Sequence, residues 1–163
     1  HPDIQVGGPA MDSYYIWDEG GCYEQFIEYT EKMQCSPEFL AIDVYPSKKG
    51  EKEEGEKIVL IEKPEAFSQA TSRDEKYMEH LLDRLEKFHK KRDGKVPEIV
   101  FIEWNSTIWQ RDLTNDTCFK AAYIAKNVLE NYDRAAAYGY WGLSDYMEEV
   151  APAQEEFHGG AQA

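Results

Sequence analysis

Apolar residues along the chain follow two patterns that alternate from one end to the other. Residues 99–102 are all apolar, and residues 39–45 are apolar except for Asp43. Such runs are typical of strands buried on both faces. Apolar residues recur every three or four positions in residues 20–34 and 78–88, which is the spacing of one helix face. The pattern therefore predicts strands that alternate with amphipathic helices.

Seven main elements are expected. In order, they are a strand at 4–6, a helix at 20–34, a strand at 39–45, a helix opened by the capping box Ser72–Glu75, a strand at 99–102, a helix from Cys118 capped by Thr114 or Asn115, and a strand at 135–143. The charged residues 47–57 are expected to form a surface loop, followed by a small extra strand at 58–61. Because buried strands that alternate with helices form parallel sheets, the sequence predicts an α/β fold with crossover helices.

The length of 163 residues limits how much of such a fold the chain can hold. A complete (β/α)8 barrel needs about 250 residues, so four strands and three helices amount to about half of one. No linker divides the sequence, which indicates one partial domain over residues 1–163. The chain starts at His1 and not at Met, so we expect it to be a piece of a longer protein.

Composition narrows the range of partners. The formal net charge is −14, which argues against nucleic acid as a partner because phosphates would be repelled on average. No apolar run approaches the length of a membrane span. Three cysteines without CxxC spacing argue against a disulfide framework and against a zinc knuckle. With no visible signal peptide, we expect a reducing, cytoplasmic compartment.

Candidate chemistry lies where the expected strands end, since parallel β/α folds bind ligands at the carboxyl ends of their strands. These ends are 8–10, 43–45, 103–105 and 141–145. Glu103 directly follows four apolar residues, so its carboxylate is expected to point into the mouth of the barrel. Burial of a carboxylate is costly unless it is paired. A catalytic acid and a structural acid bonded to a neighbour are both open at this point.

Three further residues surround that position. Asp43 and Tyr45 alternate along one strand and therefore point to the same side, so Tyr45 is placed to donate a hydrogen bond to Glu103. Trp141 follows an aromatic strand and offers a flat apolar surface that suits a sugar ring, although a core or rim aromatic is the alternative. The four histidines are scattered, so we expect neither a metal site nor a cofactor.

Five segments together resemble glycoside hydrolase family 39, whose best-known members are β-xylosidases. The segments are Phe101–Thr107 (FIEWNST), Asn115–Lys126 (NDTCFKAAYIAK), Val6–Ala10 (VGGPA), Tyr140–Asp145 (YWGLSD) and Phe157–Gly160 (FHGG). They span nearly the whole chain. The resemblance implies the C-terminal half of a (β/α)8 barrel, strands five to eight, and a retaining hydrolysis of glycosides.

The resemblance also implies roles for individual residues. Glu103 matches the catalytic nucleophile, Tyr45 a residue that bonds the nucleophile, and Trp141 a wall of the glycone subsite. Glu148 and Glu149 match an acidic pair that binds sugar hydroxyls. Asp43 stands where the family carries His, which implies an altered subsite and leaves open a sugar other than xylose.

The family's acid/base Glu belongs to an Asn-Glu motif that this sequence lacks. The resemblance therefore implies that the isolated chain, with one of two carboxyl groups, does not turn over a carbohydrate substrate. Its expected partner is the missing N-terminal half of the barrel or, in a self-pairing homodimer, a second copy. The alternative function is a sugar-sensing, non-catalytic barrel module of a regulatory protein.

Overall fold

The computed structural model describes residues 3–47, 71–92, 94–108, 112, 114–115 and 117–142. Its elements are β1 (Ala10–Asp12), the 3-10 helix η1 (Ser13–Tyr15), α1 (Cys22–Lys32), β2 (Phe39–Val44), α3 (Tyr77–Lys91), β3 (Glu98–Trp104), α4 (Cys118–Asn131) and β4 (Ala137–Tyr140). The strands form one parallel sheet in the order β1-β2-β3-β4. The prediction of a partial (β/α)8 architecture with parallel strands and crossover helices is confirmed.

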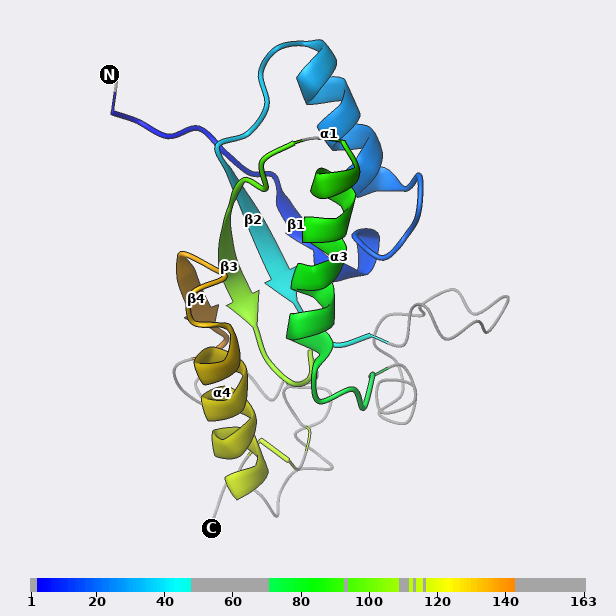
Figure 1. Cartoon of the computed structure of the whole chain (residues 1–163). Coiled ribbons are helices and arrows are strands. Elements are labelled where there is room, and N and C mark those ends of the chain that lie inside the picture. Colours follow the sequence, from blue (N-terminus) through cyan, green and yellow to red (C-terminus); the bar gives the residue numbers. More distant parts are fainter. Residues whose placement is uncertain are drawn as a thin grey trace, which may run out of the picture.

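Helices α1, α3 and α4 lie on one face of the sheet (Figure 1). Every second residue of β2 turns toward them, and these residues are the buried Leu40, Ile42 and Val44. They form one core with the helix residues Ile27, Leu81, Leu82, Leu85 and Tyr123 and with the strand residues Ile99, Phe101 and Trp104. Burial of this apolar surface is the main force that holds the helices to the sheet.

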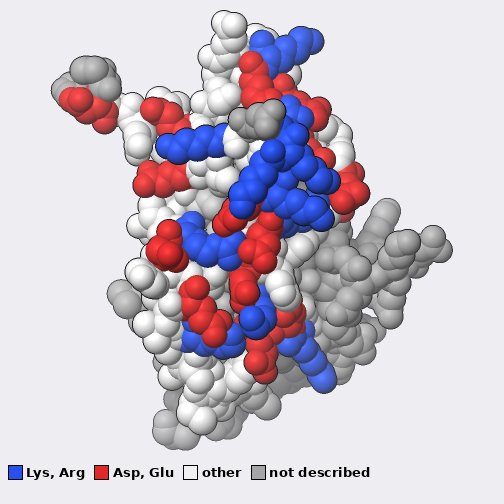
Figure 2. Space-filling model, in the orientation of Figure 1, with Lys and Arg blue, Asp and Glu red and all other residues white. Residues whose placement is uncertain are grey.

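The outer surface of the helices is charged. In Figure 2, basic and acidic side chains lie together on the visible face, and ion pairs include Lys90–Glu86 on α3 and Lys76–Glu79 at its start. The inner stripe of the same helix is apolar and buried. The helix is thus amphipathic in the way its sequence spacing predicts. No described helix is long and apolar enough to cross a membrane.

The first strand lies later in the chain than its sequence predicts. Ile4 and Val6 are 65% and 70% exposed, and β1 instead comprises Ala10–Asp12. The preceding segment runs beside β2, where the backbone N–H of Gly8 donates to the carbonyl of Phe39. The prediction of a strand at 4–6 ending at 8–10 was therefore wrong, since β1 ends at Asp12.

Both later helices begin after the residues expected to cap them. Ser72 Oγ accepts from the backbone N–H of Asp74 in a turn that precedes α3, which starts at Tyr77. Thr117 stands at the start of α4, in place of the expected Thr114 or Asn115. Local hydrogen bonds within the connecting turns thus compete with helix caps. Of the surface loop expected at 47–57, only Ser47 is described, and the extra strand at 58–61 lies outside the described residues.

Candidate active site at the carboxyl ends of the strands

A bulge in β3 brings Glu103 to the face of the sheet that the helices leave uncovered. Phe101 and Trp104 both lie in the helix-side core, so strict alternation from Phe101 would also turn Glu103 toward the helices. The register between β2 and β3 shifts at this point, and Asp43 pairs with Glu103 while Ile102 is the additional residue. Such a bulge re-aims a side chain, and here it places two carboxylates on the same face.

Tyr45 supplies a hydrogen bond to that carboxylate. Its phenol Oη donates to Glu103 Oε2 over 3.0 Å, and the Tyr45 side chain is buried at the end of β2. Burial is the main cause that raises the pKa of Tyr45, and the bond to Glu103 raises it further. The phenol therefore stays protonated and acts as a donor. The hydrogen bond expected from the sequence is present.

A row of three carboxylates crosses this edge of the sheet. Asp12, Asp43 and Glu103 are register partners on β1, β2 and β3. Burial raises the pKa of Asp43, and the negative charges of Glu103 and then Asp12 raise it further. Asp43 Oδ1 is buried and has no hydrogen-bond partner among the described residues. The row thus places three acidic side chains next to one another and favours the protonated form of Asp43 more than in water.

Asp12 was missed in the sequence because the first strand was expected too early. Its carboxyl accepts from the backbone N–H of Tyr14 over 2.7 Å and caps η1. The signal was available in the segment Ala10–Asp12, where an apolar Met11 is followed by an acid and then by Ser13. This is the strand-then-acid order that also marks Glu103.

Asn105 connects three elements directly after β3. Its backbone N–H donates to the Val44 carbonyl of β2 over 3.2 Å. Its side-chain Nδ2 donates to the Trp141 carbonyl at the end of β4 over 2.5 Å. The sequence motif contained Asn105, but its connecting position was not predicted. The loop that follows Glu103 is thereby tied to the strands on both sides.

Trp141 leaves part of its ring open to solvent at the end of β4. The residue is 37% exposed, and its backbone N–H donates to the carbonyl of Trp104 over 3.0 Å. Glu103 lies near the carboxyl end of β3, and Trp141 directly follows the adjacent strand β4. A partly exposed indole at this edge offers a flat apolar surface.

The remaining expected residues have no described position. Glu148 and Glu149 lie outside the described residues, as do the closing residues 157–160. Among the residues with a described placement, no three His, Cys, Asp or Glu side chains are arranged to hold a metal ion.

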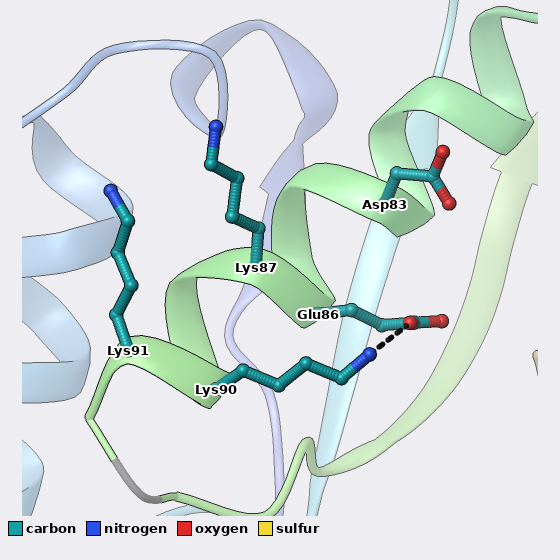
Figure 3. A pocket seen from close by; sticks show the side chains of 5 residues that line it. All are labelled: Asp83, Glu86, Lys87, Lys90 and Lys91. Atoms are coloured by element: carbon teal, nitrogen blue, oxygen red, sulfur yellow. Dashed lines mark hydrogen bonds and ion pairs between the residues drawn. The ribbon is translucent and has the colours of Figure 1, made fainter.

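A shallow hollow elsewhere on the surface has a different character. It is lined by Asp83, Glu86, Lys87, Lys90 and Lys91, all from α3 (Figure 3). Lys90 Nζ and Glu86 Oε2 form an ion pair of 3.1 Å across it. Most of these residues belong to the C-terminal half of α3, which lies near the amino ends of the strands (Figure 1). We interpret it as a solvated charged surface.

The fold and this edge of the sheet define a class of protein. Parallel β/α units of this kind carry their functional groups at the carboxyl ends of the strands, and the described groups there are a hydrogen-bonded carboxylate, two further acids and an exposed indole. The chain is therefore a segment of a (β/α)8-barrel protein with carboxylates at the edge of the sheet where such proteins bind their ligands.

Comparison with known proteins gives the family. The model of glycosyl hydrolases family 39 matches residues 1–163, and the chain belongs to this family. It is 28% identical to a β-xylosidase of Geobacillus stearothermophilus, over 98% of this chain and 29% of the relative. It is 30% identical to a β-xylosidase of Caldicellulosiruptor saccharolyticus, over 97% of this chain and 28% of the relative. The chain thus spans less than a third of the length of these curated relatives.

A solved structure supports the fold. The monomeric β-xylosidase from Caulobacter crescentus CB15 superposes with a TM-score of 0.61 at 21% identity, covering 88% of this chain and 26% of that structure. At this identity the likeness concerns the fold alone. It agrees with a partial TIM barrel.

Proposed function

We propose that these residues form the nucleophile-bearing part of the active site of a retaining β-glycosidase that hydrolyses β-xylosides or related glycosides. The observation that carries the proposal is the position of Glu103, which a bulge turns to the carboxyl edge of the sheet and which accepts a hydrogen bond from Tyr45 over 3.0 Å. The substrate class is suggested by the β-xylosidases that the chain resembles.

In this mechanism the Glu103 carboxylate attacks the anomeric carbon of the bound sugar. A bond forms between a carboxylate oxygen and that carbon, while the bond to the leaving-group oxygen breaks and its electron pair stays with the leaving group. Water then attacks the same carbon and releases Glu103. Tyr45 donates to Oε2 and so orients the carboxylate, which leaves the other oxygen to attack. Trp141 covers the apolar face of the sugar ring.

The second carboxyl group belongs to the rest of the barrel. A retaining glycosidase needs an acid/base to protonate the leaving group, about 5 to 5.5 Å from the nucleophile. We therefore propose that the functional unit is the complete enzyme, meaning these residues together with the first half of the barrel. That half would also cover the exposed Ile102 and the open edges of β1 and β4.

Turnover of an aryl β-xyloside tests whether hydrolysis needs both halves of the barrel. The purified 163-residue chain is expected to show none, whereas the complete enzyme hydrolyses the substrate and loses activity on Glu103→Gln. Turnover by the isolated chain would contradict the proposal, and it would direct attention to Asp43 as a second acid because Asp43 pairs with Glu103 in the sheet. A complete enzyme that binds xylose without hydrolysing xylosides would favour the sugar-sensing alternative.

A further inference from the structure

Lys120 is a buried cation in the first turn of α4. The residue is 6% exposed, and the amino end of a helix is its positive end, where a second positive charge is unfavourable. Burial lowers the pKa of Lys120 to about 8, while the negative charge of Asp112 acts in the opposite direction. An apolar side chain of similar length would avoid this cost. The position of Lys120 therefore calls for a reason other than stability.

The contacts of Lys120 lie on the loop that follows the proposed nucleophile. Its ammonium Nζ donates to Ser106 Oγ over 2.5 Å and also to Asn105 Oδ1. Both acceptors are uncharged side chains, two and three residues after Glu103. The ammonium thus holds residues 105–106, which follow β3, against the first turn of α4.

Asn105 links Lys120 to Trp141, the residue that follows β4. With Oδ1 turned toward Lys120 and toward the backbone N–H of Ser106, Nδ2 faces the opposite way and donates to the Trp141 carbonyl. An amide side chain has one acceptor and one donor end, so a cation at Oδ1 fixes which end meets Trp141. Without the ammonium, Oδ1 would keep only the backbone N–H of Ser106 as a donor, and the Asn105 amide would be held less firmly against the Trp141 carbonyl.

We propose that Lys120 is a positioning residue for sugar binding, because it orients the Asn105 amide and through it sets the position of Trp141 relative to Glu103. The inference rests on the proposed function for its link to the sugar. Its structural part stands independently, since it predicts a movement of Trp141 that can be observed without substrate.

Two measurements on Lys120→Met test the inference. The first uses the complete enzyme labelled with 5-fluorotryptophan, without substrate, and follows the fluorine resonance of Trp141, assigned by Trp141→Phe. The second measures kcat and KM of the complete enzyme for an aryl β-xyloside, per active site titrated with a fluoro-sugar. The control is Lys126→Met on the same helix, where the lysine is partly exposed and pairs with Glu130.

Lys120→Met is expected to shift the Trp141 resonance and to lower kcat/KM about tenfold, mainly through KM, as for a lost hydrogen bond to a charged group. Lys126→Met changes neither. An unchanged Trp141 resonance would overturn the inference. An unchanged KM with fewer titratable active sites would also overturn it, because Lys120 would then only support folding. If Lys120→Met does not fold, Lys120→Gln takes its place with the same readouts. An inactive wild-type enzyme would refute the proposed function, whereas the fluorine resonance would still decide the role of Lys120.

Discussion

The two faces of the sheet use the same strands for opposite purposes. On β2, the residues that face the helices are Leu40, Ile42 and Val44, whereas Asp43 faces the uncovered side and Tyr45 ends the strand beside Glu103. The core on the helix side is mainly apolar and stabilises the fold through burial. The uncovered side places acids next to one another and raises the pKa of Asp43. The apolar core and the candidate active site thus lie on opposite faces of one sheet.

This difference makes the two faces respond differently to substitution. Loss of an apolar group from the helix side should reduce the free energy of unfolding. Loss of a polar group from the uncovered side should reduce activity with little change in stability, because repulsion between acids is relieved. The following substitutions test this contrast, from the largest expected effect to the smallest.

Glu103→Gln in the complete enzyme is expected to lower kcat by about 10⁴-fold or more, as for other enzymes that lose a nucleophile. The free energy of unfolding should stay the same or rise, since one charge of the acidic row is removed. Steady-state kinetics and urea denaturation measure the two quantities. A variant with reduced stability and normal turnover would assign Glu103 to the structural role.

Phe101→Ala, two residues earlier on β3, is expected to lower the free energy of unfolding by about 3 to 5 kcal/mol. The ring is fully buried in the helix-side core and packs against Tyr138. The substitution leaves a cavity, but residual folded enzyme keeps its KM. Denaturation curves at several protein concentrations give the loss. A loss below about 1 kcal/mol would mean that the helix side is not the stabilising face.

Tyr45→Phe is expected to reduce kcat/KM about tenfold, because the hydrogen bond to Glu103 Oε2 is lost. The matched control is Tyr138→Phe, which removes a phenol that donates to the Asn131 carbonyl on the helix side. That control should lower stability and leave kcat/KM unchanged. If both substitutions reduced kcat/KM equally, the hydrogen bond of Tyr45 would have no special role in activity.

His89 provides a smaller effect within the helix side. Its Nε2 lies 2.7 Å from the Tyr23 phenol, between α3 and α1. Burial lowers the pKa of His89, an effect that Arg92 adds to and that the negative charge of Glu31 partly offsets. The unfolded state therefore binds a proton more readily than the folded state.

The free energy of unfolding is expected to fall by about 1 kcal/mol as the pH drops from 7.5 to 5.5, because the unfolded His89 takes up a proton below about 6.5. His89→Phe should flatten this fall. His80→Phe, which alters a half-exposed histidine paired with Asp74, should preserve it. Urea denaturation at the two pH values measures the difference, and a fall that persists in His89→Phe would assign the pH dependence to other groups.

The helix side could be predicted from the sequence better than the uncovered side. Apolar periodicity placed β2, β3 and the apolar stripe of α3 correctly because burial of these residues requires that spacing. The hydrogen bond from Tyr45 to Glu103 was also predicted, since both residues follow buried strands. The four apolar residues before Glu103 predicted the strand, but they did not predict that a bulge sets the direction of the Glu103 side chain.

The bulge in β3 was not predictable, because it depends on the register against β2 and not on any residue of β3 alone. Asp12 was missed for a related reason. Ile4 and Val6 satisfied the apolar pattern of a strand, and only their exposure in the structure rejects it. The contacts of Lys120 join residues fourteen or more positions apart and were outside the reach of local patterns. Sequence patterns thus predicted burial, while neighbouring strands determined the site.

The assignment of Glu103 as nucleophile is tested most directly by covalent labelling. The complete enzyme is treated with a 2-deoxy-2-fluoro-β-xyloside that carries a dinitrophenyl leaving group, which departs without an acid catalyst. The labelled peptide is then sequenced by mass spectrometry. The account predicts one fluoro-sugar per molecule, bound to Glu103 and absent from Glu103→Gln. A label on Asp43, Asp12 or any residue other than Glu103 would contradict it.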